Sequence, residues 1–111
     1  MNTKSKKLHL TIKNIFKKHS LSSNHANICA NALINAELVG APSHGLSRLK
    51  MYCDRINKKV INPKPKIKIK RISQSITQID GNNSIGFVAA DIGIKKAISN
   101  AKNTGIGFVG I

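Results

Sequence analysis

Residues 43–48 read Ser-His-Gly-Leu-Ser-Arg, and they begin a stretch with helical spacing that we expect to end near Asn57. His44, Arg48 and Tyr52 are spaced four residues apart, so on a helix they share one face. Apolar residues recur at steps of three and four on the opposite face, namely Leu46, Leu49, Cys53 and Ile56. The stretch therefore predicts a helix that buries its leucines and presents an imidazole, a guanidinium and a phenol.

Three residues at the start of this stretch determine how its backbone can run. Pro42 interrupts the preceding chain, and Ser43 is expected to cap the new helix. Gly45 falls in the expected first turn, where a glycine costs up to about 1 kcal/mol relative to alanine. We therefore expect that something other than helix propensity requires a bare backbone at Gly45.

The residues before Pro42 favour two helices. The first is expected over residues 4–18 and is closed by His19 and Ser20. Ser22 is the expected N-cap of the second helix, which ends at Gly40. The apolar residues of the first helix are Leu8, Ile12, Ile15 and Phe16, and those of the second are Ala26, Cys29, Ala30, Leu33 and Ala36.

The second half of the chain favours a hairpin, a helix and a final strand. Residues 66–70 alternate lysine with isoleucine, which predicts a half-exposed strand, and residues 76–79 predict its hairpin partner. A helix is expected over residues 86–102, with Gly105 as its C-terminal stop. Its expected inward residues are Phe87, Ala90, Ile94, Ala97, Ile98 and Ala101. Residues 106–111 are apolar and typical of a strand.

This order of elements predicts an α/β protein whose 111 residues here have an α+β arrangement. We expect a helical segment over residues 1–62, which carries the Ser-His-Gly motif. Residues 63–111 would form the hairpin, helix and strand that begin a second domain. A helix followed by an apolar strand is half of a βαβ crossover, so we expect the chain to be the N-terminal portion of a longer protein.

The composition limits the classes of function. The net charge of +15 suggests a nucleic-acid partner. However, the excess is scattered lysine, and aromatic residues make up only 4% of the chain, so nucleic-acid binding is disfavoured. No apolar run is long enough for a membrane span or a signal peptide. Cys29 and Cys53 fit no metal spacing and are expected to be free thiols in the cytoplasm.

The shared face of His44, Arg48 and Tyr52 suits a small 2-oxo or 2-hydroxy acid. An imidazole can exchange a proton with a carbonyl or hydroxyl oxygen near neutral pH. Ser43 lies beside His44 and can orient its ring, and the fork of Arg48 matches a carboxylate. The spacing alone is equally typical of a solvated helix face. The other histidines (His9, His19 and His25) lie far apart in the sequence without acidic or thiol partners, so no metal site is expected.

Residues 36–52 read Ala-Glu-Leu-Val-Gly-Ala-Pro-Ser-His-Gly-Leu-Ser-Arg-Leu-Lys-Met-Tyr, and they resemble the signature of a known enzyme family. This is the malate/L-lactate dehydrogenase family of the non-Rossmann type, which includes ureidoglycolate, sulfolactate and diketogulonate-type oxidoreductases. The resemblance extends over nearly the whole chain, from about Leu8 to Ile111. It continues through Asn62-Pro63, Ile79-Asp-Gly81, Gly86 and Ala101-Lys-Asn-Thr-Gly-Ile-Gly107.

The resemblance implies the N-terminal part of an enzyme that transfers hydride between NAD or NADP and a small 2-oxo/2-hydroxy acid. It implies that His44 is the proton donor or acceptor, with Ser43 as its orienting partner. Arg48 would bind the substrate carboxylate, and Tyr52 would line the pocket. Glu37 occupies a position where the family usually has aspartate, and it is not expected to take part in proton transfer.

The family forms homodimers, and most of its nicotinamide contacts would lie beyond residue 111, so the cofactor-binding residues of this chain stay unknown. The chain alone is not expected to be active, because hydride transfer without a held nicotinamide has no donor. The alternative function is a small basic module that binds nucleic acid or another anionic partner through Lys66, Lys68 and Lys70. A third option is an inactive remnant.

Overall fold

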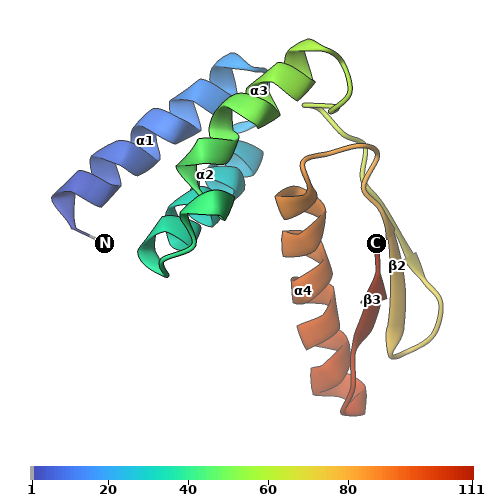
Figure 1. Cartoon of the computed structure of the whole chain (residues 1–111). Helices are drawn as coiled ribbons and strands as arrows, with labels where there is room; N and C mark the ends of the chain where they lie inside the picture. Colours follow the sequence, from blue (N-terminus) through green and yellow to red (C-terminus); the bar gives the residue numbers. More distant parts are fainter. Residues whose placement is uncertain (1) are drawn as a thin grey trace. The chain divides into compact units, whose positions relative to one another are not determined.

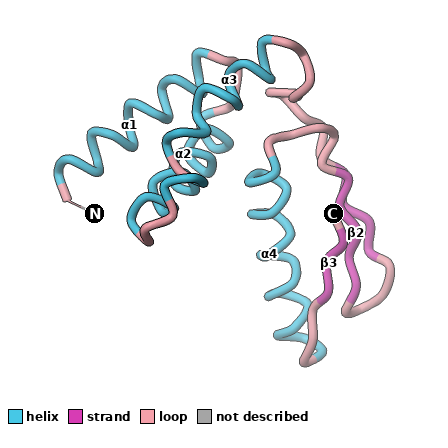
Figure 2. Tube along the Cα trace, in the orientation of Figure 1, coloured by secondary structure: helices cyan, strands magenta, loops and turns pink. Residues whose placement is uncertain are grey.

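The structure is a computed structural model that describes residues 2–111. Its contacts divide the chain into two compact units (Figure 1). Unit 1 ends at Lys64, and unit 2 extends from Pro65 to Ile111. Unit 1 is helical, whereas unit 2 combines strands with a helix (Figure 2). The predicted α+β arrangement is confirmed.

Unit 1 contains three α-helices and two short 3-10 turns. The helices are α1 (Thr3–Lys18), α2 (Ser23–Leu38) and α3 (Leu49–Asn57). The turns η1 (Pro42–His44) and η2 (Leu46–Arg48) connect α2 to α3. Helices α1 and α2 lie side by side, and both turns contact α2 (Figure 1).

The first two helices are each capped at their N-terminus by a side chain. Asn2 Oδ1 accepts a hydrogen bond from the Ser5 amide at the start of α1. Ser22 Oγ accepts one from the His25 amide at 3.1 Å, which confirms the predicted cap of α2. The core of unit 1 is then built from the apolar faces of these helices, and its largest fully buried side chains include Phe16, Ile12, Leu33 and Cys29.

The predicted helix over residues 43–57 is wrong in its first half. The α-helix begins only at Leu49, and Ser43 is not its cap. Gly45 separates the two 3-10 turns with φ −102° and ψ −132°, a backbone that no helix continues through. His44 and Arg48 therefore belong to two different turns rather than to one helical face.

Unit 2 is a three-stranded sheet with a helix packed against β2 and β3 (Figure 1). The strands are β1 (Lys68–Arg71), β2 (Ile76–Asp80) and β3 (Phe108–Gly110), and the helix is α4 (Gly86–Thr104). Strands β1 and β2 form the predicted antiparallel hairpin, and β3 pairs with β2 in parallel. Thr77 and Ile79 are the buried residues of β2. Gly105 ends α4 in the left-handed conformation, as predicted.

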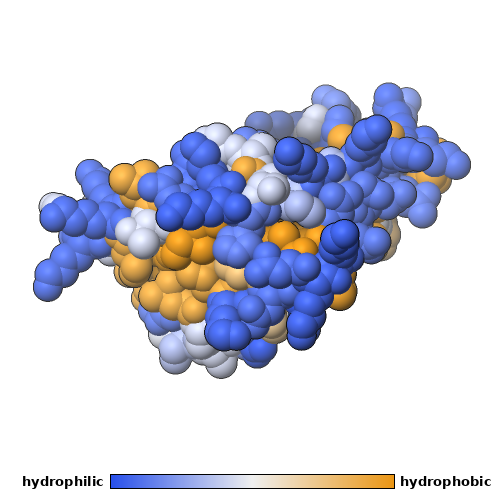
Figure 3. Space-filling model, turned by 90° about the horizontal axis from the view of Figure 1, so that it is seen from above, coloured by the Kyte–Doolittle hydropathy of each residue, from blue (hydrophilic) through white to orange (hydrophobic). Residues whose placement is uncertain are grey.

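The expected inward face of α4 is wrong at Ala90, Ile94 and Ile98, which are exposed. Val88, Ala89 and Gly93 are buried, whereas Ile94 is 58% exposed and Ile98 is 50% exposed. A Cβ on Gly93 would lie 3.1 Å from Ile111 Cδ1. The absence of a side chain at Gly93 therefore lets the residues at the end of the chain approach α4 closely. Helix α4 has two apolar stripes, and the sheet covers only one. Figure 3 shows hydrophobic residues (orange) gathered at the surface between hydrophilic residues (blue).

A second close approach in unit 2 involves Gly107. A Cβ on Gly107 would clash with the carbonyl oxygen of Ala97 and would lie 2.7 Å from its carbonyl carbon. This backbone atom belongs to α4 and cannot rotate away as a side chain can. The chain can therefore pass from α4 into β3 at this distance only with glycine at this position.

We expect Gly107→Ala to lower the free energy of unfolding by about 1–3 kcal/mol, because either α4 or β3 must shift to make room for the methyl group. Urea denaturation followed by circular dichroism measures the change. Gly110→Ala is the matched control, since a Cβ there meets nothing within 4 Å and the control should be near neutral. Equal effects of the two substitutions would contradict this account.

The two cysteines differ in their surroundings. Cys29 lies in the core of unit 1, and burial raises the pKa of its thiol to about 12. Cys53 on α3 is half-buried, and burial raises its thiol pKa as well, with a smaller contribution from the charge of Asp54. A raised pKa means that the neutral thiol is the dominant form below that value, and only the thiolate is strongly nucleophilic.

At a pH of about 8 we expect Ellman's reagent to modify Cys53 in the folded chain and to modify Cys29 only after unfolding. The thiolate fraction of Cys29 at that pH is on the order of one in ten thousand. The measurement is the reaction time course, with Cys53→Ser as the control that should abolish the folded-state reaction. Modification of Cys29 at the rate of Cys53 would show that the core of unit 1 is not as described.

Candidate functional site

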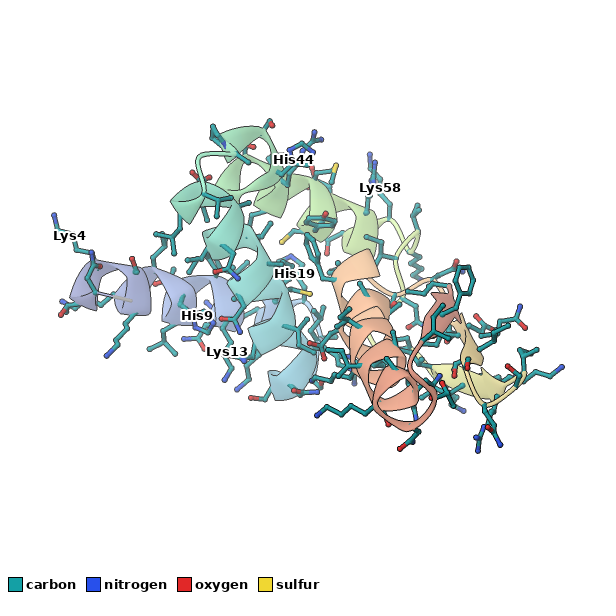
Figure 4. All side chains as sticks on the ribbon, turned by 90° about the horizontal axis from the view of Figure 1, so that it is seen from below. Lys4, His9, Lys13, His19, His44 and Lys58 are labelled. Atoms are coloured by element: carbon teal, nitrogen blue, oxygen red, sulfur yellow. The ribbon has the colours of Figure 1, made fainter. Side chains whose placement is uncertain are left out.

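Ser43 and His44 form a hydrogen-bonded pair in η1. Ser43 Oγ and His44 Nδ1 are 2.9 Å apart, and both side chains are exposed. His44 Nε2 makes no hydrogen bond within the described chain, so it is available at the surface of unit 1. Figure 4 shows His44 on the segment between α2 and α3, apart from His9 on α1 and from His19, which follows the end of α1. The pair thus offers one free imidazole nitrogen on a ring whose other nitrogen is held.

The guanidinium of Arg48 is held against the same serine. Arg48 Nε donates to the Ser43 carbonyl oxygen at 2.7 Å, and Nη1 lies 3.8 Å from Met51 Sδ. A guanidinium has five N–H donors, and these two contacts use one on Nε and one on Nη1. Three donors on the outer end of the fork are therefore available to an anion.

Ser43 connects the two candidate chemical groups. Its hydroxyl contacts the imidazole of His44, and its carbonyl oxygen accepts from Arg48. The structure thus brings three of the predicted site residues together, although it does so across two 3-10 turns and not along one helix. Tyr52 lies on α3, one turn after Arg48, and its side chain is half-buried.

Backbone hydrogen bonds give this segment its shape. The His44 amide donates to the Ala41 carbonyl at 3.0 Å, and the Arg48 amide donates to the Gly45 carbonyl at 3.0 Å. Ser47 Oγ donates to the Pro42 carbonyl at 2.9 Å, which closes the two turns on each other. The exposed residues of this segment are therefore fixed by hydrogen bonds within residues 41–48.

Glu37 is a residue of this site that sequence reasoning missed. It lies near the end of α2, and its Oε1 accepts a hydrogen bond from the Leu46 amide at 2.8 Å. The contact spans nine residues, so no helical or strand period indicates it. The only signal in the sequence was Gly45, whose presence in an expected helix called for another explanation.

Basic side chains outnumber acidic ones in unit 1. Unit 1 has two acidic side chains, Glu37 and Asp54. Asp54 is paired with Lys50 at 2.7 Å, and the hydrogen bond from Lys50 lowers the pKa of the Asp54 carboxyl. Arg48 therefore has no carboxylate partner within the described chain, which leaves its charge to attract an anion from solution.

The described residues contain neither a metal-binding cluster nor a glycine-rich phosphate loop. They contain no group of three histidine, cysteine or acidic side chains that could hold a metal ion. The turn before α4 lacks a glycine-rich phosphate loop: it reads Asp-Gly-Asn-Asn-Ser-Ile, and a Cβ on Gly81 would contact Ala89 and Ser84. We assign no residue of this chain to a nicotinamide cofactor. Among the described residues, no helix has the length and hydropathy of a membrane span.

Comparison with known proteins identifies the family. The sequence model of the malate/L-lactate dehydrogenase family matches residues 3–111. The chain is 41% identical over 91 residues to malate/(S)-sulfolactate dehydrogenase of Methanothermus fervidus, which is 82% of this chain and 27% of that protein. It is 33% identical over 104 residues to ureidoglycolate dehydrogenase (NAD(+)) of Escherichia coli, which is 94% of this chain and 30% of that protein.

A solved structure has the same fold. The malate dehydrogenase of Pyrococcus horikoshii superposes with a TM-score of 0.91 at 38% identity, over 95% of this chain and 30% of that chain. The 111 residues thus span less than a third of the length of the relatives named here. Because the family model matches almost every residue, the chain belongs to the malate/L-lactate dehydrogenase family.

Proposed function

We propose that this chain provides the substrate side of an NAD(P)-dependent dehydrogenase that acts on small 2-hydroxy acids. The observation that supports this most directly is the pair of contacts made by Ser43, which hold a proton-exchanging imidazole and a carboxylate-binding guanidinium on one segment. Malate, sulfolactate and ureidoglycolate, the substrates in the relatives' names, all carry a hydroxyl group on the carbon next to a carboxylate.

In this proposal Arg48 binds the substrate carboxylate. The three N–H donors that remain on its fork form charge-assisted hydrogen bonds with the carboxylate oxygens. The contact from Nε to the Ser43 carbonyl fixes the plane of the guanidinium before substrate arrives. Binding therefore does not require ordering of a long flexible side chain.

His44 exchanges the proton at the C2 oxygen. During oxidation, Nε2 accepts the hydroxyl proton, and Nδ1–H of the resulting imidazolium donates to Ser43 Oγ. During reduction, Nε2–H returns the proton to the carbonyl oxygen. Nδ1 keeps its proton throughout, so Ser43 Oγ accepts from it and the bond between Ser43 and His44 persists in both protonation states.

A nicotinamide cofactor supplies or accepts the hydride when it is bound. The name of one relative specifies NAD(+), which supports a nicotinamide for this family member without deciding between NAD and NADP. The proposal places the enzyme in the cytoplasm, where the two free thiols of the described chain are stable. The homodimer implied by the resemblance stays a prediction. The named relatives give no support to the alternative of a nucleic-acid-binding module.

The proton-transfer role can be tested in a chimera. The matched segment of the Pyrococcus horikoshii malate dehydrogenase is replaced by this chain, and malate oxidation is followed through NAD(P)H absorbance. We expect His44→Ala to lower kcat about 100-fold or more, since general acid–base catalysis contributes that much. His25→Ala is the matched control and should leave kcat unchanged.

The 111-residue chain alone is expected to show no malate oxidation in the same assay, because we assign none of its residues to the nicotinamide that carries the hydride. An active chimera whose kcat is insensitive to His44→Ala would refute the assignment of the proton donor. Turnover by the chain alone would refute the proposal that this chain provides only the substrate side of the active site.

The role of Arg48 predicts a different kinetic effect. Arg48→Lys in the chimera should raise KM for malate about 10- to 100-fold and change kcat much less, because the carboxylate is bound equally in the ground and transition states. Lysine keeps the charge but lacks the planar fork and the Nε bond to Ser43. Arg55→Lys, on the exposed part of α3, is the control. An unchanged KM would exclude Arg48 as the carboxylate ligand.

A further inference from the structure

We propose that Glu37 is a positioning residue of the site: its carboxylate fixes the junction between the two turns that carry His44 and Arg48, and Gly45 makes the room for it. The relevance to catalysis rests on the proposed function. The local contacts can be tested without it.

The first observation is the hydrogen bond from the Leu46 amide to Glu37 Oε1 at 2.8 Å. Leu46 is the first residue of η2, so its amide has no acceptor inside that turn. A capping side chain in the preceding position normally serves the amide of the second or third residue, and Gly45 has no side chain. Glu37 therefore caps η2 from a different element, the end of α2.

The second observation is the space around Gly45, which is a buried residue in an otherwise exposed segment. A Cβ at this position would clash with Glu37 Oε1 and would lie 2.7 Å from Cδ and 2.8 Å from Cγ of the same side chain. The φ of Gly45 is −102°, so left-handed geometry is not the reason for glycine. The glycine is required because the carboxylate group packs directly against its Cα.

These two contacts act at one point of the chain. Ser43 and His44 precede Gly45 in η1, and Arg48 follows it in η2. Rotation about the Gly45 backbone would change the position of the imidazole relative to the guanidinium. The bond from Glu37 to Leu46 and the bond from Arg48 to Ser43 both span this glycine, and together they fix the relative position.

The contact of Glu37 can be tested by NMR on the 111-residue chain, without substrate or cofactor. In the wild-type chain the Leu46 amide proton should shift as acid protonates its carboxylate acceptor. Glu37→Gln keeps an acceptor oxygen, so it should abolish this acid shift and leave Leu46 amide exchange nearly unchanged. Glu37→Ala should speed that exchange about tenfold or more. Asp54→Ala, which removes a surface carboxylate on α3, is the control and should alter neither signal.

The role of Gly45 can be tested by a double-mutant cycle. Gly45→Ala alone should destabilise the chain, because the new methyl group meets Glu37. In the Glu37→Ala background all three clashing atoms are gone, so the same substitution should have a much smaller effect on the urea midpoint. Equal effects in both backgrounds would overturn the proposal. So would a Leu46 amide whose chemical shift does not change with pH and whose exchange rate does not change with Glu37→Ala.

The positioning role requires a third measurement, in the malate dehydrogenase chimera. Glu37→Ala should lower kcat, and Glu37→Gln should restore most of it, because a positioning acceptor does not have to carry charge. Failure of the chimera to oxidise malate would count against the proposed function and would leave the NMR and stability results intact. An active chimera that tolerates Glu37→Ala without loss would overturn the positioning role.

Discussion

The backbone at Gly45 is the constraint on which the arrangement of the site depends. It divides what would otherwise be one helix into two single turns, and the second turn leads directly into α3. The division lets the carbonyl of Ser43 meet the guanidinium of Arg48 while the serine hydroxyl meets His44. An unbroken helix would have used that carbonyl for its own backbone ladder.

The regular elements were predictable because their signals are local. The N-cap at Ser22, the left-handed stop at Gly105 and the alternation of lysine and isoleucine before β2 are each set by residues within one element. By contrast, the start of α3 and the buried face of α4 depend on contacts between elements. Glu37 of α2 determines the first, and the approach of Ile111 to Gly93 determines the second. Neither contact can be inferred from the spacing of residues along the chain.

The sequence predicted that Ser43, His44 and Arg48 lie close together, but it did not predict the geometry of their contacts. The i, i+4 spacing of His44 and Arg48 led to the right neighbours, but the groups meet through Ser43 and not across a helical face. The resemblance gives Glu37 no part in proton transfer, and its partner in the structure is a backbone amide. A backbone donor carries no residue-type signature, so no sequence motif would have revealed this contact.

The hydroxyl of Ser43 has a consequence for the tautomer of His44. When Ser43 Oγ accepts a hydrogen bond from Nδ1–H, the other ring nitrogen, Nε2, is left without a proton and can take one from an alcohol. The same bond is kept when the ring carries both protons, so the imidazole does not have to turn between the two halves of a reaction cycle. In an enzyme that works as proposed, a single orientation of the ring would therefore serve both oxidation and reduction.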